Sequence, residues 1–293
     1  MRNAFIQELV TLARQHPQIA LIVGDLGYSV IEPFADEFPD RFINAGVAEQ
    51  NMTGLAAGMA SEGYHVFTYS IANFPTFRCA EQIRNDVAYH KLPVTVVSVG
   101  GGLAYGALGY SHHAVQDYAL IRTLPNMLIA APGDPMEVRA CMRYLVEHPG
   151  PSYLRLGKAG EPNFHSDPPQ VEPGKWLKVR AGDDKRVLLS TGAGLQIAMD
   201  WIKNREYSAR TVYSMPLWSM VDKMAQTAQL SAHEEVLTIE DHLLDGGFGS
   251  WLLEAVALTG TSATVRPIAL SPEVCGTVGS QSTLNQLGGL FHR

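Results

Sequence analysis

The chain is predicted to be an α/β protein of two doubly wound domains, on three observations about its 293 residues. Short apolar runs typical of buried strands, such as Ile19–Val23, alternate with amphipathic segments of helical length. Residues 161–178 break this alternation, because they are rich in proline and polar residues, and indicate a linker. The alternation then resumes. We therefore expect a first domain with a mostly parallel sheet at 1–160 and a smaller α/β domain at 179–293.

Composition indicates a well-packed globular protein, since hydrophobic residues make up 46% of the chain and charged residues 17%. A low fraction of charge also suggests that part of the surface is covered by other subunits. The formal net charge is −7 and no dense lysine or arginine run is found, which argues against a nucleic acid partner. Cys79, Cys141 and Cys275 are far apart, without a CxxC pair, as is typical of a reducing compartment. No signal peptide or membrane-spanning run is predicted, so we expect a cytoplasmic protein.

Each element of the first domain has its own signal. Residues 2–16 are predicted to form a helix with Phe5, Leu9 and Leu12 on one side, and the strand Ile19–Val23 follows. The next predicted elements are a helix after Glu49, a strand at 65–74, a helix at 77–91, a strand at 92–100, and a helix entry at 111–117 capped by Ser111. In the second domain, residues 186–202 and 235–258 each predict a strand, a glycine-containing turn and a helix.

Glu49 stands where the helix in RFINAGVAEQNMTGLAAGMAS (residues 41–61) is predicted to begin. Small residues follow it, among them Gly54, Ala57 and Gly58, and they let a helix lie close against a strand. A carboxyl group at such a helix start would be partly desolvated, which favours the neutral acid. A neutral acid can donate a hydrogen bond to a ring nitrogen, which a carboxylate cannot do. The alternative on periodicity alone is that Glu49 only places a negative charge in the first helical turn.

Other polar residues lie where an α/β sheet binds ligands, just past the carboxyl end of a strand. Asp25 and Ser29 follow the first strand, although Asp25 is equally suited to forming a turn. His112 and His113 are adjacent and cannot face one metal ion from the same side of a helix, so a zinc site is not expected.

GVAEQNMTGLAAGMASEGYHVF resembles the segment that carries the catalytic glutamate in the pyrimidine-binding domain of the transketolase family, and Glu49 falls on that glutamate. The resemblance implies thiamine diphosphate as cofactor. In this family the glutamate hydrogen-bonds the aminopyrimidine ring and favours the imino tautomer, whose nitrogen deprotonates the thiazolium carbon. YSIANFPTFRCAEQIRN is similar to the aromatic wall around that ring. Phe74 falls on the stacking phenylalanine, and Ile71 and Phe77 fall on flanking positions.

The same resemblance implies further site residues. Asp25 matches an aspartate near the thiazolium side, and Ser29 matches a serine that contacts substrate. His112 matches a substrate-contacting histidine that could shuttle protons to the donor carbonyl or alkoxide. His113 occupies a position that is often glutamine. Lys158, with Arg155 close by in the sequence, matches a basic substrate-binding residue near the end of the domain.

Two positions depart from the sugar-phosphate transketolases. Leu108 stands where they carry an acid four places before the histidine, and Gly100 where they carry a phosphate-binding histidine. Losing a charged donor should weaken phosphate binding, on the scale of about 1.5–3 kcal/mol per charged hydrogen bond. An ordinary five-carbon sugar phosphate is therefore not expected as the acceptor.

The resemblance covers only the second and third domains of a full transketolase. The first domain holds the diphosphate and a divalent metal through a Gly-Asp-Gly segment followed by paired asparagines. Neither Gly24-Asp25 nor Gly182-Asp183 begins such a pattern, and no magnesium ligand set is predicted in this chain. We expect an N-terminal transketolase subunit to supply this domain and its Mg²⁺ or Ca²⁺, in an α2β2 heterotetramer with active sites at subunit contacts.

The predicted function is transfer of a two-carbon ketol unit between a ketose-type donor and an aldose-type acceptor, both sugar-like small molecules. Three alternatives remain. One is the β subunit of a 2-oxoacid decarboxylating dehydrogenase, and another is a ligase of the deoxyxylulose phosphate synthase type. The third, from another class, is a non-catalytic supporting subunit. SHHAVQDYALIRTLPNM favours a transketolase, and the presence of Glu49, Phe74 and His112 together argues against a silent subunit.

Overall fold

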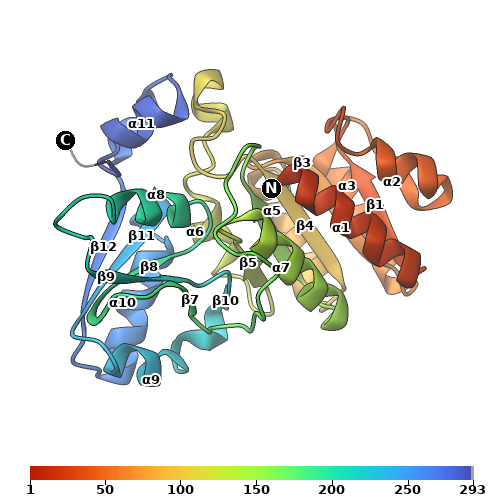
Figure 1. Cartoon of the computed structure of the whole chain (residues 1–293). Helices are drawn as coiled ribbons and strands as arrows, with labels where there is room; N and C mark the ends of the chain where they lie inside the picture. Colours follow the sequence, from red (N-terminus) through yellow and green to blue (C-terminus); the bar gives the residue numbers. More distant parts are fainter. Residues whose placement is uncertain (292–293) are drawn as a thin grey trace.

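The computed structural model describes residues 1–291, which fold around two twisted sheets lying next to each other (Figure 1). The first sheet has seven strands in the order β10-β5-β6-β4-β3-β1-β2, and the second has five in the order β12-β11-β8-β9-β7. Strand pairs within both sheets are parallel, except that β10 pairs antiparallel with β5 and β7 with β9. The prediction of two doubly wound α/β domains is confirmed. The last two residues of the second predicted domain, 292–293, lie outside the described residues.

The central strands of the first sheet are buried on both faces, as is typical of a parallel sheet. Its strands are β1 (Ile19–Val23), β2 (Phe42–Asn44), β3 (His65–Ile71), β4 (Val94–Val99), β5 (Leu128–Ala130), β6 (Ser152–Leu156) and β10 (Leu217–Ser219). All five residues of β1 and all six of β4 are buried, which explains why these continuous apolar runs were recognisable as strands. The α-helices of this part are α1 (Arg2–Gln15), α2 (Glu32–Glu37), α3 (Glu49–Ser61), α4 (Phe74–Phe77), α5 (Ala80–Gln82), α6 (Asp117–Ile121) and α7 (Pro135–Glu147).

The second sheet is also mostly parallel. Its strands are β7 (Leu177–Arg180), β8 (Asp183–Ser190), β9 (Arg210–Ser214), β11 (Glu235–Leu243) and β12 (Thr264–Leu270). Its α-helices are α8 (Gly194–Trp201), α9 (Gln226–Ser231), α10 (Phe248–Thr259) and α11 (Gln281–Leu287). The segment predicted as a linker, 161–178, runs into β7, because Leu177 already pairs with Ser214 of β9.

Three local predictions are wrong, and each error has a physical cause. The strand predicted at 65–74 ends at Ile71, because Pro75 cannot donate to a ladder and instead opens the short helix α4. The helix predicted at 77–91 is broken into α4, α5 and a π-helical turn at Ile83–Ala88. Ser111 caps no helix. Its segment is a 3-10 turn, Tyr110–His112, and the next helix begins only at Asp117.

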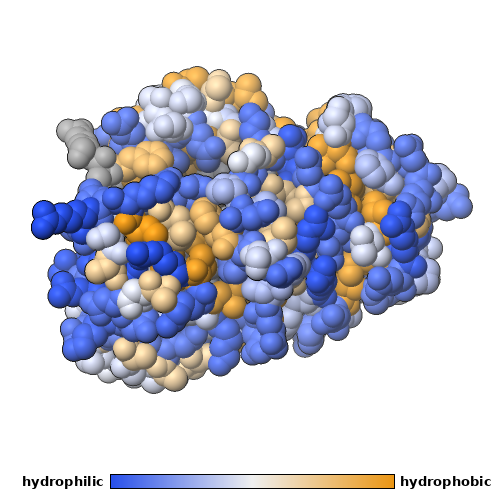
Figure 2. Space-filling model, in the orientation of Figure 1, coloured by the Kyte–Doolittle hydropathy of each residue, from blue (hydrophilic) through white to orange (hydrophobic). Residues whose placement is uncertain are grey.

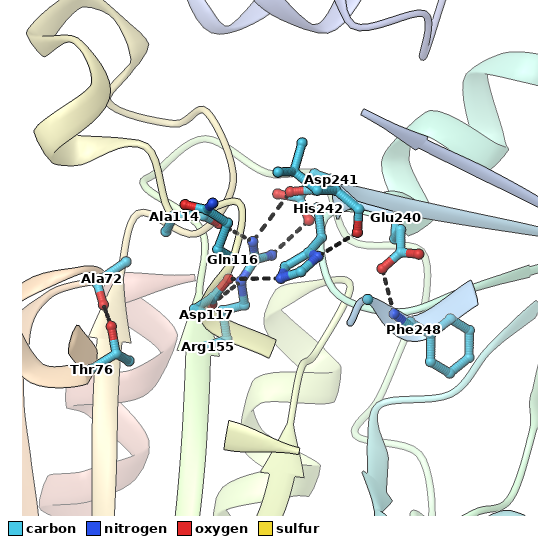
Figure 3. A network of polar contacts seen from close by, with 12 residues as sticks. Ala72, Thr76, Ala114, Gln116, Asp117, Arg155, Glu240, Asp241, His242 and Phe248 are labelled. Atoms are coloured by element: carbon cyan, nitrogen blue, oxygen red, sulfur yellow. Dashed lines mark hydrogen bonds and ion pairs between the residues drawn. The ribbon is translucent and has the colours of Figure 1, made fainter. Parts of the chain in front are cut away.

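The two halves of the chain are joined by a strand and by a buried ionic network. β10, which follows the second half's β9 in the chain, adds to the edge of the first sheet beside β5. Arg155 of β6 lies between Asp117 of α6 and Asp241 of β11, at 2.7 and 2.6 Å (Figure 3). Burial raises the pKa of the Asp241 carboxyl, although Arg155 opposes this shift. Among residues 1–291, no helix is both long enough and apolar enough to cross a membrane.

Candidate active site

Glu49 is the first residue of α3, and its side chain is only 2% exposed. The helix packs against β3 through a buried face that includes Met52, Ala56 and Ala60. Ser70, near the carboxyl end of β3, donates its hydroxyl to Glu49 Oε1 at 3.2 Å. The predicted helix start and the predicted desolvation of this acid are therefore both present in the structure.

Arg78 completes the surroundings of Glu49. Its Nη1 donates to Glu49 Oε2 at 2.9 Å, while the arginine side chain is 49% exposed. The guanidinium carbon lies 4.3 Å from the centroid of the Phe74 ring. The sequence reasoning named neither Arg78 nor Ser70. A usable signal for Arg78 was present, since it is a basic residue four positions after the predicted stacking Phe74.

The residues of the predicted aromatic wall lie at the end of β3 and in α4. Phe74 is half-buried and is the first residue of α4, Ile71 is the half-buried last residue of β3, and Phe77 is exposed. The ring of His112 meets Phe74 edge-on, with centroids 5.2 Å apart. Phe74 thus contacts both His112 and the arginine that binds Glu49.

A loop of two 3-10 turns, Gly106–Leu108 and Tyr110–His112, carries the two histidines. The side-chain amide of Asn73 holds this loop next to Phe74, donating to the carbonyl of His113 at 2.6 Å and of Ser111 at 3.3 Å. Burial, together with the neighbouring His113, lowers the pKa of His112 from its ordinary value of 6.5. His112 is therefore neutral at pH 7 and can accept a proton.

His113 is placed differently from its neighbour. Its imidazole is 1% exposed, and Nε2 lies 3.3 Å from the carbonyl oxygen of Gly106. In this arrangement His113 supports the fold of the loop and offers no open surface to a substrate.

Asp25 and Ser29 lie in the turn after β1, both exposed and both with positive φ, 55° and 65°. Hydrogen bonds from Asn44 at 3.0 Å and from the Tyr28 hydroxyl at 2.9 Å lower the pKa of Asp25. A positive φ is strained for residues other than glycine and is found at functional turns. The turn presents an ionised carboxylate at the carboxyl edge of the first sheet.

The basic residues near the end of β6 have separate surroundings. Arg155 is buried in the network of Figure 3 and is not available to a ligand. Lys158 is exposed, with Nζ 5.2 Å from the centroid of the Tyr105 ring. Tyr105 covers Gly100 so closely that a Cβ there would lie 2.1 Å from its ring. A side chain at position 100 would therefore require Tyr105 to move.

The chemistry of this cluster suits the pyrimidine half of the expected cofactor. A buried carboxyl group and a half-exposed aromatic ring, both in contact with the Arg78 guanidinium, can together hydrogen-bond and stack a flat heteroaromatic ring. Within residues 1–291, no group of three or more histidine, cysteine, aspartate or glutamate side chains could hold a metal ion.

Comparisons with known proteins agree with this geometry. The chain matches the models of the transketolase pyrimidine binding domain over residues 1–160 and of the transketolase C-terminal domain over residues 174–290. It is 33% identical over 281 residues to one subunit of the apulose-4-phosphate transketolase of Phocaeicola vulgatus, covering 93% of this chain and 88% of that one. It is 30% identical over 295 residues to 1-deoxy-D-xylulose-5-phosphate synthase of Clostridium perfringens, covering 98% of this chain and 47% of the synthase.

A solved structure of a split gene transketolase, described as an inactive β4 tetramer, has a TM-score of 0.85 with this chain at 31% identity. The match covers 99% of this chain and 93% of that one. The chain therefore belongs to the transketolase family, which depends on thiamine diphosphate. Within that family it is similar over nearly its whole length to subunits of split transketolases, which confirms the resemblance drawn from the sequence.

Proposed function

We propose that this chain is the pyrimidine-binding subunit of a heteromeric transketolase, which transfers a two-carbon ketol unit from a ketose-type donor to an aldose-type acceptor. The observation that carries the proposal is a cluster in which Arg78 links the buried Glu49 carboxyl to the Phe74 ring, and the imidazole of His112 meets that ring edge-on. In this proposal residues 1–160 form the pyrimidine-binding domain, and the predicted linker leads into the C-terminal domain, whose sheet begins at Leu177.

In this proposal Glu49 binds the aminopyrimidine ring and holds or releases a proton at the ring nitrogen. Phe74 stacks on the ring, and Ile71 and Phe77 line its edges. Asp25 lies toward the thiazolium side. When bound, thiamine diphosphate supplies the nucleophilic carbon that attacks the donor carbonyl.

His112 acts on the substrate. As a neutral imidazole beside Phe74, it accepts a proton from a substrate hydroxyl and returns it to the developing alkoxide. Ser29 and Lys158 contact the more distant substrate atoms, and His113 holds the loop. Because Tyr105 covers Gly100 and lies beside Lys158, the acceptor end is lined by an aromatic ring and one amine. Since Gly100 supplies no side-chain donor for a phosphate, we propose a sugar-like acceptor other than an ordinary five-carbon sugar phosphate.

A partner chain completes the site. Large apolar side chains are exposed on the segments that carry the site residues: Tyr28, Val47, Phe77, Leu108 and Tyr110. Such exposure is typical of a protein–protein contact. Figure 2 shows apolar surface interrupting an otherwise hydrophilic face of the molecule. The partner is the N-terminal transketolase subunit, which holds the diphosphate with Mg²⁺ or Ca²⁺, and the assembly is α2β2.

The test is a titration of thiamine diphosphate and Mg²⁺ into the purified chain alone and into the chain with the product of an adjacent gene resembling the missing domain. We expect binding only to the pair. Tight binding to the chain alone would contradict the proposed division of the site.

The second candidate function is a reaction of the deoxyxylulose phosphate synthase type, which the similarity to that synthase supports. Donor assays on the same pair of subunits distinguish it from ketol transfer. Turnover of hydroxypyruvate or a ketose supports ketol transfer, whereas condensation of pyruvate with an aldehyde supports the synthase-like reaction.

A further inference from the structure

Both carboxyl oxygens of Glu49 already have partners within this chain. Ser70 donates to Oε1 at 3.2 Å and Arg78 donates to Oε2 at 2.9 Å. The same guanidinium lies over Phe74, 4.3 Å from the ring centroid. A flat, delocalised group bearing N–H donors thus binds the acid and the aromatic face at once.

These are the two contacts that the proposed function gives to the aminopyrimidine ring. That ring is also flat and delocalised, and it would also stack on Phe74 and hydrogen-bond Glu49. Both groups cannot occupy the same place. We propose that Arg78 is an intrachain gate, which fills the aminopyrimidine position in the cofactor-free chain and must be displaced when the cofactor binds. This inference rests on the proposed function.

The surroundings of the two partners determine which one moves. Glu49 is fixed, because its side chain is 2% exposed and its Oε1 accepts a hydrogen bond from the Ser70 hydroxyl at 3.2 Å. Arg78 lies between the short helices α4 and α5 with its side chain half exposed, so it can turn out into solvent. Glu49 therefore keeps its place while its partner is exchanged.

The gate also keeps Glu49 paired in the cofactor-free chain. Its carboxyl is buried, and a buried polar group without a hydrogen-bonding partner is costly. Arg78 supplies that partner until the aminopyrimidine ring takes its place.

Binding of thiamine diphosphate tests the gate. Calorimetric titration of the complex with its partner, in the presence of Mg²⁺, would compare wild type with Arg78→Met. Methionine keeps part of the aliphatic bulk and removes the competing cation. We expect the variant to bind the cofactor about three- to tenfold more tightly, since one half-exposed ion pair no longer has to be broken. Arg84→Met is the matched control, because Arg84 is exposed and its guanidinium contacts Asn85.

In a Glu49→Gln background, Arg78→Met should not increase the affinity for the cofactor, because glutamine is uncharged and forms no ion pair with Arg78. Equal or weaker binding by Arg78→Met would overturn the gate and leave the proposed function standing. Absence of binding to the wild-type complex would overturn the proposed function, and the gate with it.

A second readout needs neither cofactor nor partner. Urea unfolding of the free chain would be measured for wild type, each single variant and the double variant. We expect Arg78→Met to lower the folding equilibrium constant about three- to tenfold in wild type and less than twofold in Glu49→Gln. Additive effects would show that the two side chains do not interact in the free chain, and this would overturn the gate independently.

Discussion

At the scale of single residues, Glu49 is expected to be indispensable to turnover and dispensable to folding. Glu49→Gln keeps the size of the buried side chain, but an amide cannot cycle a proton with a ring nitrogen. We expect ketol transfer by the complex with the partner to fall roughly 10²–10⁴-fold, as is usual when an acid–base group is lost. The melting temperature of the free chain should stay within a few degrees. Near-normal turnover by this variant would contradict the mechanism.

His112 is expected to set the acid limb of the pH profile. Its folded pKa lies below 6.5, so the neutral form that accepts a proton is present at pH 7 and is lost as the pH falls through the lowered value. A profile of kcat against pH should therefore decline on the acid side below pH 6.5. His112→Gln should lower kcat and flatten that limb. An unchanged limb in this variant would assign the titration to another group.

The motifs in the sequence named Glu49, Phe74 and His112, whose roles stay predictions, and did not name the residues that reach Glu49 through packing. In the structure Phe74 contacts His112, and Arg78 connects Phe74 to Glu49. Ser70 and Arg78 were missed because they reach Glu49 only once α3 lies against β3 and α4 turns back toward the helix start. The spacing of Arg78 four positions after Phe74 is visible in the sequence, but its contact with Glu49 is visible only in the packed fold.

At the scale of elements, the prediction succeeded where one interaction dominates. β1 is entirely apolar and β4 carries only Thr95 and Ser98 as polar residues, so both strands are stable only when both of their faces are buried. The prediction for the segment after β3 was wrong because several weak conformational preferences compete there. Its helical periodicity is interrupted by Pro75, a π-helical turn at Ile83–Ala88, and the contacts of Asn73 with the histidine loop. These tertiary contacts fix the path of the chain beside the site.

His65, the first residue of β3, is expected to make stability depend on pH. Its Nε2 lies 3.0 Å from Thr95 Oγ1, and burial, with a smaller effect of His16, lowers its pKa to about 4. The unfolded chain, with a pKa of 6.5, binds the proton more readily. The contribution of the neutral His65 to stability is therefore complete above pH 6.5 and is lost as the pH falls toward 4.

His65→Asn keeps a hydrogen-bonding group but cannot titrate in this range. The unfolding free energy of wild type relative to this variant should drop by about 2 kcal/mol between pH 7 and pH 5. Urea unfolding should be used to measure the difference in unfolding free energy between wild type and variant at each pH. The difference is needed because burial raises the pKa of Glu240 to about 8, so the contribution of Glu240 to stability decreases as the pH rises, opposite to that of His65. A pH-independent difference would show that His65 is solvated in the folded protein.

At the scale of the whole molecule, the two halves are joined more tightly than a linker between two domains suggests. β10 lies in the second half of the sequence but completes the first sheet, and a strand of three residues gives too short a pattern to be recognised. Arg155, which the sequence reasoning noted beside the proposed substrate-binding Lys158, instead connects α6 of the first half to β11 of the second. Long-range pairings of this kind are decided by the complete fold.

Arg155→Met should therefore destabilise the whole chain. The substitution leaves Asp117 and Asp241 buried without their shared cation, and breaking a buried pair in this way costs about 3–5 kcal/mol. Urea unfolding should show a lower midpoint or a separate early transition of one half. Arg14→Met is the control, because Arg14 pairs with Glu37 at the surface and its loss should cost less than about 1 kcal/mol. If both variants unfolded like wild type, the buried network would not be what holds the halves together, and β10 with the apolar core that the halves share would have to join them.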